Sequence, residues 1–194
     1  PLGVEVGLNH VAGSLLDRVE LEEVGFRGFG VRFSAARLVL QWSPRGLLDR
    51  TLHLRTLQLD DVSLALPPSA EEETGPPEIP SLQLPIAIRL DQFEVRHLRI
   101  AQGELEQRIG ALSLSASLDG RRLAVRSLNL QMEGMQLDGF LNMQPTAPHA
   151  IDGRIAVELA AEVTGEDVGA VSAVVDLAGV ALEPRIDLKL DRPA

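Results

Sequence analysis

The chain has 194 residues, is 45% hydrophobic with a mean hydropathy of +0.08, and carries a formal net charge of −10. It is long enough for one large domain or two small ones, and its hydrophobic content excludes a disordered chain. Because contacts to nucleic-acid phosphates need clustered Lys and Arg, the acidic balance argues against a nucleic-acid partner. The one lysine is Lys189 and the arginines are scattered through polar positions, so no basic patch is visible in the sequence.

Residue counts exclude further classes of protein. The chain has no cysteine, which rules out disulfides, thiolate metal ligands and cysteine nucleophiles. Its unbroken apolar runs are far shorter than the roughly 18 to 20 residues that cross a bilayer as a helix. Aromatic residues make up 3%, so the apolar positions are almost wholly Leu, Val, Ile and Ala. The chain opens at Pro1 without a Met, and we therefore expect it to be part of a longer protein.

Alternation of apolar and polar residues is the main pattern of the chain, and it gives a β-strand one apolar and one polar face. In the first quarter it runs through 4–8, 19–26, 29–33 and 38–42, with a phase slip at Glu22-Glu23 that indicates a bulge. Short strands that follow one another in this way are typical of an antiparallel meander.

The segment 43–50 does not alternate. Ser43 can serve as an N-cap and Pro44 as the first helical residue, which predicts a single helical turn. Alternation resumes at 52–59, and Asp60-Asp61 is the predicted turn into the next strand.

Residues 67–80 are rich in Pro, Ser, Glu, Thr and Gly and include the acidic run Glu71-Glu72-Glu73. We expect a mobile acidic loop here, because a charge run between strands is more often solvated than part of a binding site. Alternation returns at 82–90, where Pro85 indicates an edge, a bulge or a strand start, and it continues to residue 190. Asp119-Gly120 is a hairpin signal within this part.

Catalytic and metal-binding motifs are missing from the sequence. The four histidines, His10, His53, His97 and His149, lie in separate segments without metal-ligand spacing, and His53 and His97 are expected to be exposed strand residues. There is no phosphate-binding glycine loop and no Gly-x-Ser-x-Gly elbow. We therefore expect no catalytic residue, no metal and no cofactor, and the chain is not expected to be an enzyme.

The question left open is what covers the apolar face. About fourteen strands are expected, and at about 4.8 Å per strand a single unclosed sheet would be about 65 Å long. A second sheet could cover its apolar side as a sandwich, or the sheet could curl into a trough filled by an apolar ligand. No amphipathic segment is long enough for a helical layer. The low aromatic content favours a surface that need not interlock with one partner, and an exposed apolar face of this size is tolerated mainly where something binds.

A resemblance to a known family rests on the order of these segments. They are Gly13-Ser14-Leu15-Leu16, 19–26, 36–42, 57–64, and the acidic loop followed by 79–86 with its Leu84-Pro85 strand. In this order the chain resembles the N-terminal periplasmic part of the TamB-like proteins, a branch of the AsmA-like group that is similar to bridge-like lipid transfer proteins. The likeness covers most of the chain, best from Leu2 to about Met143.

This resemblance implies a fold and a function. It implies one elongated all-β unit over residues 1–194, a long antiparallel meander curled into an open, β-taco-like trough with an apolar concave face and one or two very short helices. It further implies a periplasm-spanning phospholipid conduit, held to the bacterial inner membrane by an N-terminal helix that this chain lacks. Acyl chains would lie in the trough, and an Omp85-class, TamA-like outer-membrane protein would be contacted through a region absent here.

Nine residues are predicted by alternation phase to line the lipid groove: Leu38, Leu40, Leu84, Ile86, Ile88, Leu112, Leu114, Leu128 and Leu130. A different reading is a periplasmic scaffold whose sheet edges template the strands of outer-membrane β-barrel proteins during their assembly. A third interpretation is a closed sandwich that binds no ligand.

Overall fold

The structure, a computed structural model, describes residues 5–14, 16–28, 30–67, 85–103, 105–164 and 169–191. The strands are β1 Glu5–Gly7, β2 His10–Gly13, β3 Arg18–Gly28, β4 Val31–Ser43, β5 Thr51–Leu66, β6 Ala87–Gln102, β7 Leu105–Leu118, β8 Leu123–Met132, β9 Met135–Met143, β10 Ala150–Leu159, β11 Val171–Val180 and β12 Glu183–Asp191. Two short helices accompany them, the 3₁₀ helix η1 Pro44–Asp49 and α1 Ala161–Thr164. No helix in this described part of the chain is long and apolar enough to cross a membrane.

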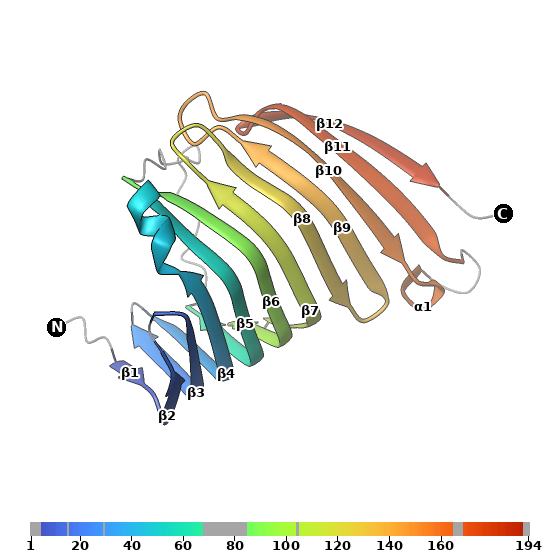
Figure 1. The fold of residues 1–194 in the computed structure, drawn as a ribbon. Coiled ribbons are helices and arrows are strands. Elements are labelled where there is room, and N and C mark those ends of the chain that lie inside the picture. The colour runs from blue at the N-terminus through green and yellow to red at the C-terminus, as the bar shows by residue number, and fades with distance from the viewer. Residues whose placement is uncertain are drawn as a thin grey trace.

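All twelve strands form one open sheet in chain order (Figure 1). The split pair β1 and β2 lies along one edge, beside β3, and β12 forms the other edge. Every pairing is antiparallel except that of β5 with β6, which is parallel. The predicted fold class, an open antiparallel meander with very short helices, is confirmed, and the parallel pair is a feature that alternation could not indicate.

The number of strands is twelve because several predicted strands are single long ones. β5 and β6 have 16 residues each. The predicted turn at Asp60-Asp61 is wrong, because β5 continues through these residues without interruption. Asp61 takes the left-handed backbone conformation, with φ of 52°, and this bends the strand without ending it. The phase slip at Glu22-Glu23 has the same basis, since Glu23 also has φ of 52°. The bulge predicted there is wrong, because β3 and β4 keep their register across these residues.

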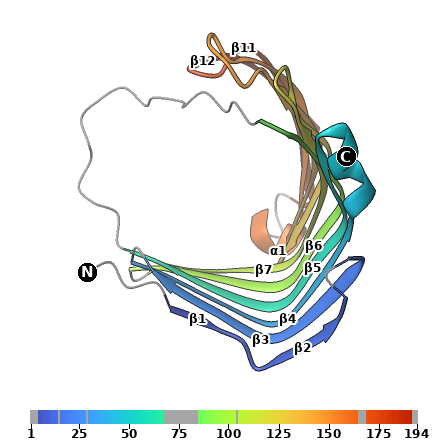
Figure 2. The same cartoon turned by 60° about the vertical axis from the view of Figure 1, so that its left-hand side comes forward.

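These residues belong to a first bend that crosses five neighbouring strands. The register places Glu23, Ala36, Asp61, His97 and Gly110 side by side from β3 to β7. At each crossing, two successive residues face the polar side of the sheet, so the apolar alternation resumes in the correct phase beyond it. Figure 2 shows the resulting shape, in which β3 to β7 turn along their length into the wall of a trough.

A second bend crosses β4 to β9 nearer to η1. Here extra residues on β5, β6 and β8 face regular positions on β4, β7 and β9, with register shifts beside Gln41, Leu90, Ser115 and Val125. Such bulges increase local twist and bend the bulged strand. The two bends together curl the sheet.

The apolar face lies inside the curl. Leu59 and Val62 stand on opposite sides of the first bend in β5, yet they belong to one buried cluster with Ala35 and Val95. Residues flanking the bend can meet only on its inner side. The exposed and mostly charged pairs at the bend therefore mark its outer, convex side.

Both local turn predictions are confirmed in outline. The predicted helical turn is η1, although the Ser43 side chain makes no capping hydrogen bond. The Asp119-Gly120 hairpin joins β7 to β8, and an Asp119 carboxylate oxygen accepts hydrogen bonds from the backbone N–H groups of Arg121 and Arg122 at 2.7 and 2.8 Å. These bonds lower the pKa of Asp119 from its ordinary value. Of the predicted acidic loop, residues 68–80 lie outside the described residues.

The first bend provides a test of the backbone argument. We expect Asp61→Val to lower the free energy of unfolding by about 2 kcal/mol, because a β-branched residue is strongly disfavoured in the left-handed conformation. Asp61→Asn should have a much smaller effect, since Asn tolerates that conformation. Urea denaturation of both variants measures the difference. Equal losses would mean that the carboxylate, and not the backbone, holds the bend.

Candidate functional site

The sheet register carries apolar side chains of successive strands into continuous rows on the concave face. One row runs from β2 to β12 without a polar residue: Val11, Leu21, Leu38, Leu59, Val95, Leu112, Leu130, Leu137, Val157, Ala173 and Leu190. At about 4.8 Å between strands, these eleven residues span about 50 Å. The neighbouring row is formed by Val19, Leu40, Leu57, Phe93, Leu114, Leu128, Gly139, Ile155, Val175 and Leu188.

All predicted groove residues that lie within the described strands are on this concave face. Leu38, Leu112 and Leu130 fall in the first row, and Leu40, Leu114 and Leu128 fall in the second. Ile88 pairs with Leu52 and Leu118 in a further row nearer to η1. Ile86 is half-buried and precedes β6, and Leu84 lies outside the described residues.

This face is open to solvent along most of its length. Fully buried hydrophobic residues in the described chain are few, namely Val19, Ala35, Val39, Leu59, Val62, Val95 and Ala124. The solvent-accessible surface is 13369 Å², whereas a globular protein of 21.0 kDa exposes about 9000 Å². Every described strand belongs to the one sheet, so a closed sandwich is not formed within the described residues.

The convex face is polar and is tied together by charged pairs between strands. Arg37 of β4 contacts Glu20 of β3, and Arg154 of β10 donates to Asp176 of β11 at 2.6 Å. The Arg154 guanidinium lowers the pKa of Asp176. These pairs are largely exposed, so each adds little stability.

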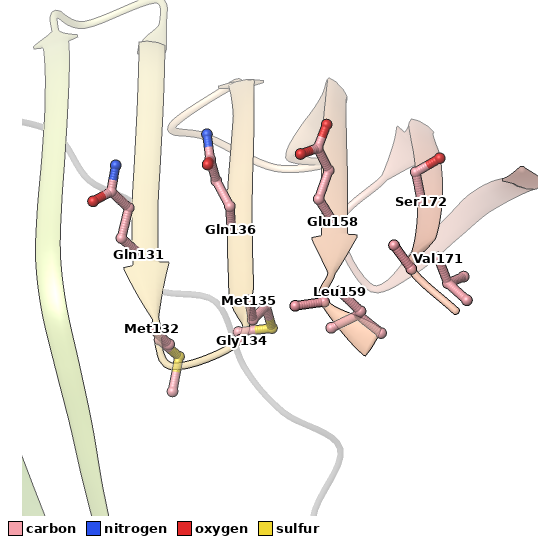
Figure 3. A pocket seen from close by; sticks show the side chains of 11 residues that line it. Gln131, Met132, Gly134, Met135, Gln136, Glu158, Leu159, Val171 and Ser172 are labelled. Carbon is pink, nitrogen blue, oxygen red and sulfur yellow. The ribbon is translucent and has the colours of Figure 1, made fainter. Parts of the chain in front are cut away.

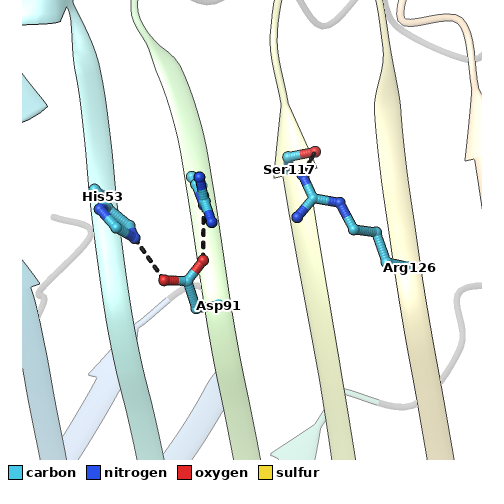
Figure 4. A network of polar contacts seen from close by, with 5 residues as sticks. His53, Asp91, Ser117 and Arg126 are labelled. Atoms are coloured by element: carbon cyan, nitrogen blue, oxygen red, sulfur yellow. Dashed lines mark hydrogen bonds and ion pairs between the residues drawn. The ribbon is translucent and has the colours of Figure 1, made fainter.

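Two histidine–aspartate pairs join the parallel strands β5 and β6 on the convex side. His53 Nε2 lies 2.6 Å from Asp91 Oδ2 at the second bend (Figure 4). His97 Nδ1 lies 3.0 Å from Asp61 Oδ1 at the first bend. His97 is an exposed strand residue as predicted, whereas His53 is half-buried. Sequence reasoning missed both pairs because their partners are 38 and 36 residues away, on a strand whose parallel register no local pattern reveals.

Asp91 accepts hydrogen bonds from two neighbours on the convex surface of the sheet. Burial raises the pKa of Asp91, but hydrogen bonds and favourable charge interactions with His53 and Arg89 outweigh it, and the pKa lies below its ordinary value. Arg89 Nε donates to the second carboxylate oxygen at 2.7 Å. Both oxygens are therefore engaged by neighbours on the sheet surface.

A hollow of about 550 Å³ lies at the strand ends opposite η1, beside α1 (Figure 3). The register places Gln131, Gln136, Glu158 and Ser172 in one polar row along it, and Met135 is among its apolar lining residues. The row carries a single carboxylate, so it offers no acid–base pair. The described residues contain no group of three or more His, Asp or Glu that could hold a metal ion.

The arrangement as a whole suits a non-directional apolar ligand. The concave rows are aliphatic and carry no hydrogen-bonding side chain in the central row, so they can bind alkyl chains through burial alone.

Comparison with known proteins agrees with this geometry. The model of one protein family, described as the TamB N-terminal domain, matches residues 4–154, which reach from β1 into β10. The family is one of transport and assembly proteins, is not known as an enzyme family, and is periplasmic and anchored in the inner membrane. No curated protein and no solved structure matches the chain.

The Asp91 pair leads to a pH-dependent prediction. Because its pKa is lowered from the ordinary 3.8, the carboxylate stabilises the fold above that pH and the contribution is lost as the pH falls below it. We expect Asp91→Asn to cost about 0.5 kcal/mol at neutral pH, as for a partly exposed pair, and almost nothing at about pH 3. Urea denaturation at both pH values checks this. Asp49→Asn is the control, because Asp49 forms no ion pair with any described residue. An equal loss of unfolding free energy in Asp91→Asn at both pH values would contradict a stabilising role of the ionised Asp91 carboxylate.

Proposed function

The chain belongs to the TamB family, and on this premise we propose that it is a segment of a periplasm-spanning phospholipid conduit between the inner and outer membranes. The observation that carries the proposal is the unbroken aliphatic row from Val11 to Leu190, about 50 Å long at strand spacing. A family role in lipid transport and outer-membrane biogenesis supports it.

Acyl chains would lie against the concave rows with their head groups toward water. Each buried methylene group contributes roughly 0.8 kcal/mol without any directional contact, so lipids of different chain length can occupy the same surface. The predicted groove residues, from Leu38 in β4 to Leu130 in β8, would form the central floor of the path. A half-exposed apolar surface of this extent also supports the presence of an occupant.

The mechanism we propose is passive. Uniform aliphatic rows hold an alkyl chain about equally well at each strand, so the barrier to movement along the trough is low. Direction and energy would be supplied elsewhere in the transport system.

Family membership supports a proposal for the rest of the pathway. We propose that the chain works in the periplasm as part of a longer protein, held to the inner membrane by an N-terminal helix. An Omp85-class, TamA-like protein of the outer membrane would be its partner, contacted through a region beyond this chain.

Site-specific crosslinking tests whether lipid occupies the concave face. A photoreactive residue at Leu112, Leu114 or Leu130 should crosslink to phospholipid in cells, whereas the same residue at Ser113 or Gln131, on the convex face, should not. Mass spectrometry identifies the adducts. Equal labelling of the two faces, or no lipid at the concave positions, would contradict the conduit.

A charge on the floor of the trough should block lipid binding. Leu128→Asp places a carboxylate among the apolar rows, and we expect the phospholipid bound per chain in native mass spectrometry to fall about tenfold, equivalent to about 1.4 kcal/mol. Gln131→Asp is the matched control, because Gln131 lies in the same strand and points to the convex face. Circular dichroism verifies that both variants keep the sheet. Unchanged lipid binding in a folded Leu128→Asp variant would argue against the path.

A second function is favoured by the edge strand β12. In the described chain, β12 pairs only with β11, so its outer backbone groups can pair with a strand of another chain. This feature supports a scaffold that helps to assemble outer-membrane β-barrel proteins. Crosslinks from Ile186 or Leu188 to nascent barrels, without acyl adducts in the trough, would favour the scaffold over the conduit.

A further inference from the structure

Arginines that are far apart in the sequence gather at the strand ends beside η1. This surface, the basic end, comprises residues 44–56, 85–92 and 115–127, which meet because β5, β6, β7 and β8 are neighbours in the sheet. Its arginines are Arg45, Arg50, Arg55, Arg89, Arg121, Arg122 and Arg126, and its acidic residues are Asp49, Asp91 and Asp119. Seven arginines against three aspartates give these residues a formal charge of +4, or +3 with Asp152 of β10, which lines a hollow with Arg121 and Arg122, in a chain whose net charge is −10. The fold therefore builds a basic surface that the sequence does not show.

The charge of the basic end is directed outward. All seven arginines are exposed, and within the described chain only Arg89 forms an ion pair, with Asp91. Arg126 donates to the hydroxyl oxygen of Ser117 at 3.3 Å (Figure 4). The Asp119 carboxylate accepts from backbone N–H groups of Arg121 and Arg122 and so holds the turn that displays both guanidinium groups.

Arginines elsewhere in the described chain behave differently. Those within 4.0 Å of a carboxylate are Arg18, Arg27, Arg37, Arg96, Arg99, Arg108 and Arg154. Carboxylates of the same or a neighbouring strand thus neutralise most of the arginines outside the basic end, whereas those of the basic end keep their charge available for a partner.

Two exposed leucines project from the same surface. Leu47 is 46% and Leu48 86% exposed, and both lie on η1, which stands at the strand ends outside the sheet (Figure 1). Arg45 precedes them and Arg50 follows them. Adjacent leucines flanked by arginines on a projecting turn combine an apolar tip with a positive surround.

We propose that the basic end docks on an anionic phospholipid bilayer, with Leu47 and Leu48 inserted among the head groups. Arginines attract anionic lipids, and apolar side chains beside them add affinity by entering the interface. An acidic protein could satisfy the arginines, but a short leucine tip standing clear of the sheet fits the soft surface of a bilayer better. The seven arginines lie on or directly after η1, on the turn between β7 and β8 and at the ends of β5, β6 and β8, and an array of this width fits a planar surface of negative charges.

This inference stands apart from the lipid conduit, because docking can be measured with no lipid moving along the trough. Loss of docking would leave the concave rows unchanged, and loss of lipid in the trough would leave the basic end intact.

Vesicle sedimentation tests the proposal with the 194-residue chain. We expect binding to vesicles of phosphatidylethanolamine and phosphatidylglycerol, weak binding to phosphatidylcholine vesicles, and loss of binding as salt screens the charges. Removing two surface arginines, as Arg121→Gln with Arg122→Gln, should weaken binding to the anionic vesicles about 25-fold. Leu47→Ser with Leu48→Ser should weaken binding to both kinds of vesicle.

Matched controls lie at the opposite ends of the strands. Arg32→Gln removes an exposed arginine of β4 without an ion pair to any described residue, and Leu105→Ser removes a leucine that is 72% exposed in β7. Both should bind vesicles like the parent chain. No binding to anionic vesicles, or equal losses in the control and test variants, would overturn the proposal. So would binding to polyglutamate that depends on Arg121 and Arg122 while vesicles do not bind, because it would assign the surface to an acidic protein.

Insertion of the leucines can be measured separately. Because the chain has no cysteine, Leu48→Cys gives a single site for an environment-sensitive fluorophore, and Leu105→Cys gives its control. Anionic vesicles should raise and blue-shift the emission at position 48 only. Binding without a change at position 48 would disprove insertion of the leucine pair.

Discussion

The structure depends on keeping one alternation of side chains in phase across twelve strands and two bends. A slip of one residue in a strand would turn all its apolar side chains to the polar face. The sheet avoids this at the first bend by directing two successive residues outward, as Asp60 and Asp61 do in β5, so that Leu59 and Val62 both face inward. The curl of the trough and the continuity of its apolar rows therefore have the same origin.

The same constraint explains why the aliphatic rows lie on the concave face and the charged residues lie on the convex face. Aliphatic residues inside the curl meet one another along the rows, and charged residues outside it meet across strands as ion pairs. Near η1 the outer residues include arginines that form no ion pair with a described carboxylate, such as Arg55 and Arg126. A shared architecture thus gives an apolar interior surface and, at one end, a cationic exterior surface.

Period-two alternation was sufficient to predict the sheet, its apolar face and the position of residues such as Leu112 and Leu128 on that face, because side-chain direction in a strand is a local property. It could not predict that Asp60-Asp61 bends a strand instead of ending it, since the same residues favour turns. Nor could it predict the parallel pairing that brings His53 to Asp91, or the gathering of Arg50 and Arg121. These contacts depend on which strands are neighbours, and that is decided by the whole sheet.

The parallel pairing of β5 with β6 has a consequence for how the sheet forms. Most other neighbouring strands are joined by short hairpins. Between β5 and β6, however, Thr51 pairs with Ala87, and all pairs of this junction are 36 residues apart in the sequence. Closing a longer loop costs more chain entropy before any contact is gained, so contacts of large sequence separation form slowly. The strands up to β5 and those from β6 onward are thus two units of mostly local contacts, and we expect their union at this junction to be the slow step in folding of the sheet.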